Sequence, residues 1–155
     1  MLHQLTFTQI LRTDQVTAWK FISDPRNLAR ITPAEMSFTI VGQPSENMYP
    51  GQIIQYKVSP LAGIKMNWVT EITHVKEGKY FVDEQRFGPY AFWHHQHFIE
   101  QVESGVLMTD ILHYKIPFGL LGKLVNALFI RKKLGHIFSF RYAELERLFG
   151  GPEKK

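Results

Sequence analysis

The sequence contains no cysteine among its 155 residues. This absence excludes disulfide bonds, thiolate catalysis and any zinc or iron–sulfur centre held by cysteine. The sequence also lacks an apolar run of about 18 residues, the length that a membrane-spanning helix needs. The first residues show no charged segment followed by an apolar one, so we expect no signal peptide. Together these absences favour a cytoplasmic location.

Several well-known functional motifs are missing as well. We find no glycine-rich phosphate loop, no serine nucleophile elbow and no His-Glu-x-x-His zinc motif. The formal net charge is +4, and residues 115–155 hold nine Lys/Arg against three acids. This basic segment lacks the interleaved aromatic residues of a nucleic-acid groove, so we expect a solvated helix face and no nucleic-acid partner.

Alternating apolar and polar residues, typical of strands with one buried face, occupy most of the first two thirds of the chain. Asp14 and Asp24 are suited to cap two short helices after the first strand, and Pro33 would end the second. The expected strands cover residues 2–11, 36–42, 51–60, 64–75, 79–87, 90–103 and 106–118.

After Gly119 the apolar residues follow steps of three and four, which predicts one long helix ending at 150–152. Gly135 would lie inside it, where glycine costs about 1 kcal/mol relative to alanine. The missing side chain either leaves room for the sheet or a ligand, or is a tolerated imperfection. Strands joined by tight turns pair antiparallel, and a single amphipathic helix must cover one sheet face. We therefore predict one α+β domain over residues 1–150 and a flexible tail over 151–155.

The element order and one motif resemble a known superfamily. The motif is Phe81-x-Asp83-x-Gln85-x-x-Gly88-Pro89-Tyr90-x-x-Trp93-x-His95-x-His97, with Ile137-Phe138-x-x-Arg141-Tyr142 in the helix. Both are similar to the Bet v 1-like helix-grip superfamily, and within it to small bacterial START or polyketide-cyclase-like (SRPBCC) proteins. The resemblance implies a curved antiparallel sheet of about seven strands around the long C-terminal helix. It also implies a deep, mostly apolar cavity for lipids, sterols, polyketides or similar molecules; a few members catalyse cyclisation or dehydration.

The histidine-rich stretch can be divided by strand face, because residues two apart share a face. On the first strand Glu84 and Arg86 make a natural solvent-facing pair, since burying two charges is costly. That choice turns the face of Asp83 inward. On the next strand both faces mix apolar and polar residues, and the family pattern favours the face of His95 and His97. His94 would point the other way.

Four interpretations of this inward patch remain open. It could be an internal hydrogen-bonded network, or a polar anchor for a ligand in an apolar cavity. Less favoured is general acid/base catalysis, with His95, His97 and Asp83 as candidate catalytic residues. A metal site would need a third ligand such as Asp83 and a second shell of supporting groups. From the sequence alone we predict no metal and no cofactor.

The candidate ligand-binding residues follow from the same alternation and from the helix pattern. For the last strand the sequence leaves two inward faces open: Met108, Asp110, Leu112 and Tyr114, or Leu107, Thr109 and Ile111. The alternative is a filled core without a cavity. The predicted binding residues are Asp83, Gln85, Trp93, His95, His97, Phe81, Trp68, Met66, Phe138 and Tyr142.

The segment 116–133 is apolar and ends in Arg131-Lys132-Lys133. It could be a cavity lid, a dimer contact or a membrane contact, and we rank the lid first. The sequence thus predicts binding of a small hydrophobic molecule. The alternatives are a cyclase- or dehydratase-like enzyme using His95 or His97, and a membrane-surface or protein-interaction module. The sequence leaves homo-oligomerisation open.

Overall fold

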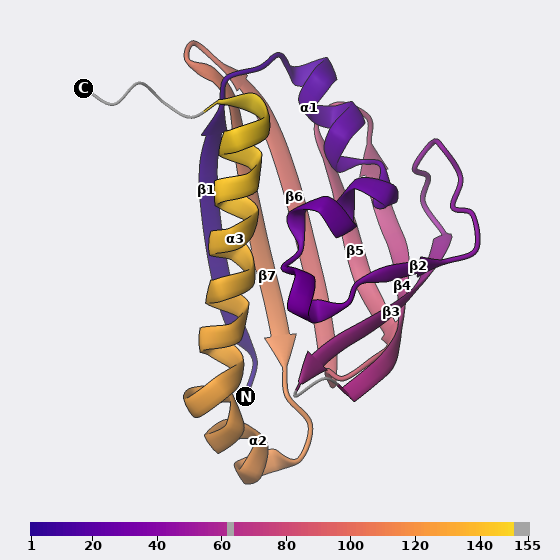
Figure 1. Cartoon of the computed structure of the whole chain (residues 1–155), viewed down its shortest axis with the longest axis vertical. Helices are drawn as coiled ribbons and strands as arrows, with labels where there is room; N and C mark the ends of the chain where they lie inside the picture. Colours follow the sequence, from indigo (N-terminus) through magenta and orange to yellow (C-terminus); the bar gives the residue numbers. More distant parts are fainter. Residues whose placement is uncertain (62–63, 151–155) are drawn as a thin grey trace.

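An antiparallel sheet forms the body of the protein (Figure 1). The computed structural model describes residues 1–61 and 64–150. Seven strands pair in the order β1-β7-β6-β5-β4-β3-β2, so the first and last strands of the chain are neighbours. The strands are β1 His3–Leu11, β2 Thr39–Val41, β3 Gln52–Leu61, β4 Ile64–Lys76, β5 Tyr80–Phe87, β6 Phe92–Val102 and β7 Gly105–Lys115.

The helices cover one face of this sheet (Figure 1). The long C-terminal helix runs along β1 and β7, and α1 with the short helices after it covers the neighbouring strands. The helices are α1 Gln15–Ile22, the 3-10 turns η1 Pro25–Ile31 and η2 Ala34–Met36, α2 Gly119–Val125, the π-helical turn η3 Asn126–Ile130 and α3 Arg131–Phe149. This arrangement confirms the predicted α+β helix-grip fold.

The predicted caps begin the short helices. The Asp14 carboxylate accepts the backbone N–H of Thr17 at 2.9 Å, and the Asp24 carboxylate accepts that of Arg26 at 3.0 Å. The second short helix is a 3-10 turn rather than an α-helix. The strand predicted over 36–42 is shorter than expected, because Ala34–Met36 forms a further 3-10 turn and Ser37 takes a left-handed conformation with φ of 46°.

The C-terminal elements follow the prediction with two corrections. The last strand ends at Lys115 rather than at residue 118, because Pro117 has no N–H to pair and Phe118 has a φ of +70°. The long helix extends to Phe149, but the turn Asn126–Ile130 is π-helical and interrupts its regular period. Gly150, with φ of 81°, ends it. The predicted tail 151–155 lies outside the described residues.

Buried apolar side chains pack between the helices and the sheet. Leu11, Val106 and Leu145 join β1, β7 and α3 at one end, and Leu112, Leu134 and Phe138 join β7 and α3 further along. A separate cluster around Tyr56 lies on β3, β4 and β5. Within the described residues, we find no helix with both the length and the apolar character to cross a bilayer.

Candidate functional site

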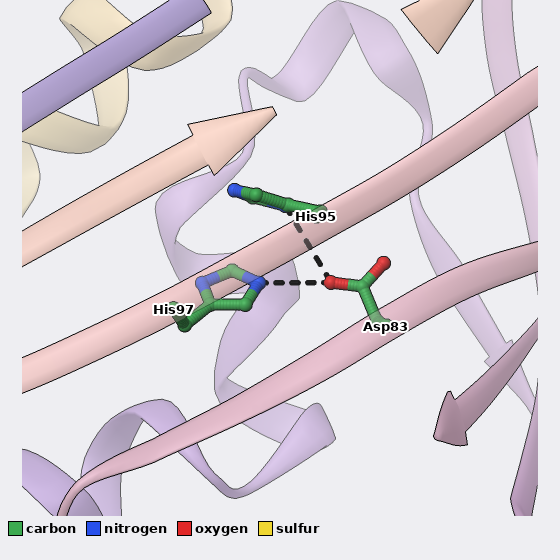
Figure 2. Close-up of side chains that lie close together, drawn as sticks. All are labelled: Asp83, His95 and His97. Carbon is green, nitrogen blue, oxygen red and sulfur yellow. Dashed lines mark hydrogen bonds and ion pairs between the residues drawn. The ribbon is translucent and has the colours of Figure 1, made fainter. Parts of the chain in front are cut away.

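Three central strands place acidic and imidazole side chains next to one another on the helix-covered face. Asp83 on β5 pairs directly with His95 on β6, and His97 on β6 pairs directly with Asp110 on β7. All four therefore occupy neighbouring positions of one face. Figure 2 shows Asp83, His95 and His97 pointing toward one another. We call these four residues the central cluster.

Asp83 contacts both imidazoles through one oxygen. His97 Nε2 donates to Asp83 Oδ2 at 2.8 Å, and His95 Nδ1 lies 3.5 Å from the same atom (Figure 2). The other carboxylate oxygen, Oδ1, accepts the indole N–H of Trp93 at 3.3 Å. The Asp83 side chain is thus held from two sides.

Asp110 meets the opposite edges of the same two rings. Its Oδ1 lies 2.8 Å from His97 Nδ1 and 3.0 Å from His95 Nε2. Neither Oδ1 nor His95 Nε2 makes a well-aligned hydrogen bond with a described partner, so this contact is mainly electrostatic. Each imidazole therefore lies between two carboxylates, one on each ring edge.

Because the central cluster is buried, its charges interact strongly and shift the pKa values of its members. His95 is 4% exposed, His97 9% and Asp110 2%. Burial would lower the pKa of His97, but the contacts with Asp110 and Asp83 outweigh it and raise the pKa above its ordinary value. Burial and the neighbouring His97 lower the pKa of His95. The first proton in the cluster therefore belongs to His97.

The two carboxyl groups stay ionised for the corresponding reason. Burial would raise the pKa of both Asp83 and Asp110. Contacts with His95 and His97 outweigh burial and lower both values. When His97 is protonated, two carboxylates and one imidazolium give the cluster one excess negative charge.

Arg141 on α3 offsets this charge. Its Nη1 lies 4.0 Å from Asp110 Oδ1, and its guanidinium carbon lies 5.0 Å from the centre of the Phe138 ring. The Arg141 side chain is 11% exposed, and its Nε is buried without a hydrogen-bond partner among the described residues. An arginine with an unused buried donor beside a cavity is a candidate contact for a polar ligand group.

Three residues of the central cluster border a cavity of about 380 Å³ between sheet and helices. Asp83, His95, His97 and Arg141 all lie on its lining. Most of the remaining lining is apolar and comes from the sheet, the short helices and α3, and includes Ile54, Trp68, Phe81, Leu134 and Phe138. A polar group at one part of an otherwise apolar pocket is typical of a small-molecule site.

Seven of the ten predicted binding residues lie on this lining: Asp83, Trp93, His95, His97, Phe81, Trp68 and Phe138. The other three predicted residues, Met66, Gln85 and Tyr142, are described by the structure but do not line the cavity. Gln85 instead exchanges two hydrogen bonds with the backbone of Tyr90 and so fixes the turn between β5 and β6. Tyr142 is 41% exposed and borders a separate groove beside β1. Met66 packs at the edge of the cluster around Tyr56.

Sequence reasoning missed Asp110 and Arg141 as site residues. Asp110 belongs to one of the two faces left open for the last strand, and the structure turns that face inward. An acid between the buried Met108 and Leu112 was the available signal. Arg141 stands three residues after Phe138, which places both on one side of the helix. As predicted, His94 points away and contacts Glu84 at 2.8 Å.

The side chains of the central cluster and Arg141 are suited to three functions. Imidazoles next to carboxylates can give or take a proton, which suits general acid/base catalysis. The charged groups and the free Arg141 Nε can anchor a ligand's hydroxyl, carbonyl or carboxylate. Two imidazoles and a carboxylate can also bind a metal ion.

Solved structures of other proteins share the fold of this chain. No family model and no curated protein matches the sequence. TTHA0849 from Thermus thermophilus has a TM-score of 0.73 at 12% identity, over 94% of this chain and 95% of that one. Major latex-like protein 151 from Panax ginseng has a TM-score of 0.69 at 13% identity, over 96% and 98%. Ms6760 from Mycobacterium smegmatis has a TM-score of 0.66 at 19% identity, over 94% and 92%. The chain therefore has the Bet v 1-like fold.

Proposed function

We propose that the protein binds one small, largely apolar molecule between the sheet and α3, with its polar end at the central cluster. The cavity of about 380 Å³ carries this proposal. Its size lies within the range of about 300–1,000 Å³ that is usual for small-molecule sites. Proteins with this fold are generally ligand-binding, which supports the same function.

In this proposal the apolar walls of the cavity supply most of the affinity for the ligand, and the central cluster orients its polar end. Removing apolar surface from water contributes about 25 cal/mol per Å² before the costs of association. Trp68 and Trp93, whose rings meet edge to face at 5.0 Å, line the cavity with two aromatic rings at right angles to each other. A hydroxyl, carbonyl or carboxylate could reach the cluster and the unused Nε of Arg141. We infer a lipid-like, polyketide-like or similar ligand with one polar end.

Native mass spectrometry of the purified protein tests the proposal first. We expect a co-purifying small molecule, removable with organic solvent, and quenching of tryptophan fluorescence when the extract is added back. The binding assays are run with EDTA, so that they report the ligand and not a metal ion. Protein that never carries a ligand, and whose fluorescence no lipid or polyketide extract changes, would contradict the proposal.

A pair of substitutions locates the binding. Val125 lies on the cavity lining, and Val125→Trp should fill part of the cavity and weaken binding about tenfold, a loss of about 1.4 kcal/mol. Leu120 is 81% exposed, and Leu120→Trp is the matched control that should leave affinity unchanged. Equal affinities for the two variants would place the ligand elsewhere.

A second proposed function concerns the surface next to the cavity. The apolar end surface consists of exposed side chains on α2 and its neighbouring turns: Phe118, Leu120, Leu124, Leu128 and Phe129, between 52% and 81% exposed. Phe118 also lines the cavity. The basic residues Arg131, Lys132 and Lys133 follow directly in the sequence. Apolar side chains beside basic ones match the charge and depth of an anionic bilayer surface.

We propose that the apolar end surface docks on anionic membranes, where the cavity could exchange its ligand. Flotation with vesicles of phosphatidylcholine and phosphatidylglycerol should carry the protein at low salt, and less at high salt. Leu120→Ser with Phe129→Ser should abolish flotation. Ile53, 58% exposed on β3, gives the control Ile53→Ser. Absence of flotation, or a dimer in solution that these substitutions dissociate, would overturn membrane docking.

A further inference from the structure

Three groups at the middle of the central cluster are of the kinds that bind transition metals. The ligand atoms of Asp83, His95 and His97 all lie within 4.8 Å of one another (Figure 2). Asp83 Oδ2 is 2.8 Å from His97 Nε2 and 3.5 Å from His95 Nδ1. In a tetrahedral site with bonds of about 2.0–2.2 Å, neighbouring ligand atoms lie about 3.4 Å apart. Small side-chain rotations therefore suffice to admit an ion.

Each of these groups has its second polar atom next to a neighbouring polar group. Trp93 donates to the other oxygen of Asp83. Asp110 Oδ1 lies beside the outer nitrogens of both imidazoles, at 2.8 Å from His97 Nδ1 and 3.0 Å from His95 Nε2. Metal-bound histidines usually direct their other nitrogen to a carboxylate, which fixes ring orientation and tautomer. Groups that could support the metal ligands thus lie beside all three of them.

From the sequence we considered a metal site with Asp83 as a possible third ligand, and we predicted no metal. The alternation showed two histidines that share a face, but it did not reveal the groups that would support them. The structure supplies the third ligand in Asp83 and the supporting carboxylate in Asp110. A buried Asp110 Oδ1 and His95 Nε2 without a well-aligned partner also indicate that the metal-free arrangement leaves these polar atoms imperfectly satisfied.

The charges and the exposure of the site suit a divalent cation. With neutral imidazoles, Asp83, Asp110 and Arg141 together carry one net negative charge, so an added divalent cation leaves one net positive charge. Asp83, His95 and His97 all line the cavity, so the side of the site away from their strands is open to a water or a ligand oxygen. Three protein ligands with an open position are the pattern of a reactive rather than a structural metal site.

We propose that Asp83, His95 and His97 bind one divalent first-row transition metal ion, with Asp110 and Trp93 as supporting groups. Two imidazole nitrogens favour zinc, iron, cobalt or nickel over magnesium or calcium, which prefer oxygen ligands. This inference does not depend on the proposed apolar ligand, since either could bind in the absence of the other.

Cobalt(II) is the probe of choice, because its visible absorption bands report bound nitrogen ligands and a low coordination number. Protein stripped with chelator and then dialysed should bind one equivalent of Co²⁺ with such bands, and Zn²⁺ should displace it. Isothermal titration with Zn²⁺ should give the same stoichiometry. Histidine side-chain NMR signals of His95 and His97 should shift on Zn²⁺ addition.

Matched variants separate this site from other histidines. His97→Gln and Asp83→Asn should each weaken Zn²⁺ binding by about a hundredfold or more, and Asp110→Asn by about 10–100-fold, the usual effect of losing a supporting group. His94→Gln, one residue before His95 but facing Glu84, should change nothing. Circular dichroism confirms which variants remain folded, and the near-isosteric Asp83→Asn keeps the test decisive if His97→Gln does not fold.

Three results would overturn the inference: no Co²⁺ bands at millimolar metal, bands unchanged in Asp83→Asn, or bands lost equally in His94→Gln. Because ligand binding is measured in EDTA, failure of the metal site leaves the proposed function intact. Loss of the apolar ligand with an intact Co²⁺ spectrum would have the opposite meaning.

Discussion

Asp83 and His95 face each other directly across β5 and β6, yet the shorter contact of Asp83 is with His97. Its Oδ2 lies 2.8 Å from His97 Nε2 and 3.5 Å from His95 Nδ1. The carboxylate therefore leans along the strand toward His97, the imidazole whose pKa is raised. Strand pairing alone would bring Asp83 next to His95 only. The diagonal contact with His97 joins all three side chains in one electrostatic group.

Replacing Asp83 should affect His97 more than His95. Asp83→Asn removes a charge next to His97 Nε2, so the pKa of His97 should fall and the free energy of unfolding should drop by about 1–3 kcal/mol, the usual cost of an imperfectly paired buried group. NMR titration of the imidazole signals and urea unfolding measure the two effects. A His97 titration that is unchanged in the variant would show that Asp83 does not stabilise its charge.

The stability of the metal-free protein should fall at both ends of the pH range. The pKa of His97 is raised, so its charge stabilises the fold below its ordinary value of about 6.5, and this contribution is lost as pH rises through the folded value. The pKa values of Asp83 and Asp110 are lowered, so their contribution is lost as pH falls through the folded values. Urea midpoints across pH, in chelator, measure both limbs.

The His97→Gln variant provides the control for the alkaline limb. It should remove most of the decline above neutral pH, whereas His94→Gln should keep it, because His94 contacts Glu84 outside the cluster. An alkaline decline of equal size in His97→Gln would assign the effect to another group.

Two glycines of the C-terminal helical segment should respond to alanine in opposite ways. A Cβ at Gly122 would overlap the carbonyl oxygen of Pro117, so Gly122→Ala should destabilise the protein by about 1–3 kcal/mol. A Cβ at Gly135 would meet nothing within 4 Å, so Gly135→Ala should stabilise it by about 0.5–1 kcal/mol. Thermal and urea unfolding of both variants would reveal the contrast. A loss of stability in Gly135→Ala would mean that this space is needed by the fold.

The cap of α1 provides a test far from the site. Asp14 accepts hydrogen bonds from the backbone N–H and the hydroxyl of Thr17, so Asp14→Ala should lower the urea midpoint. Hydrogen bonding to Thr17 lowers the pKa of Asp14, so the difference from wild type should persist at neutral pH and vanish as pH falls through that value. Asp14→Ser, which keeps a capping oxygen, should recover most of the stability at neutral pH. Equal unfolding of all three proteins would show that the cap contributes nothing.

Much of the fold could be predicted because its local signals agree. Alternation marked the strands, Asp14 and Asp24 marked helix starts, and the change of period after Gly119 marked the long helix. The inward face of β5 also followed, since Glu84 and Arg86 could not both be buried cheaply, whereas that of β6 followed only from the family resemblance. Secondary structure can be predicted from a sequence when its hydrophobic pattern, helix caps and turns all indicate the same elements.

The rest depended on contacts that no local pattern contains. Asp110 lies on a strand whose two faces are almost equally apolar in sequence, so alternation could not choose between them. Gln85 has the right face for a ligand contact, but its amide is used by the backbone of Tyr90. Irregular pairing of β4 with β5 near Thr70 and Gln85 also disturbs simple alternation there. Arg141 needed the helix rotation relative to the sheet, which only the packed structure fixes.

The π-helical turn Asn126–Ile130 changes which way the two parts of the C-terminal helix face. One residue more than a regular turn advances the winding by about 100°, so the apolar stripe of α2 is out of phase with that of α3. Leu134, Phe138 and Leu145 of α3 are buried against the sheet, while Leu120 and Leu124 of α2 are exposed. A single phase offset thus lets consecutive helical turns present apolar side chains inward from α3 and outward from α2.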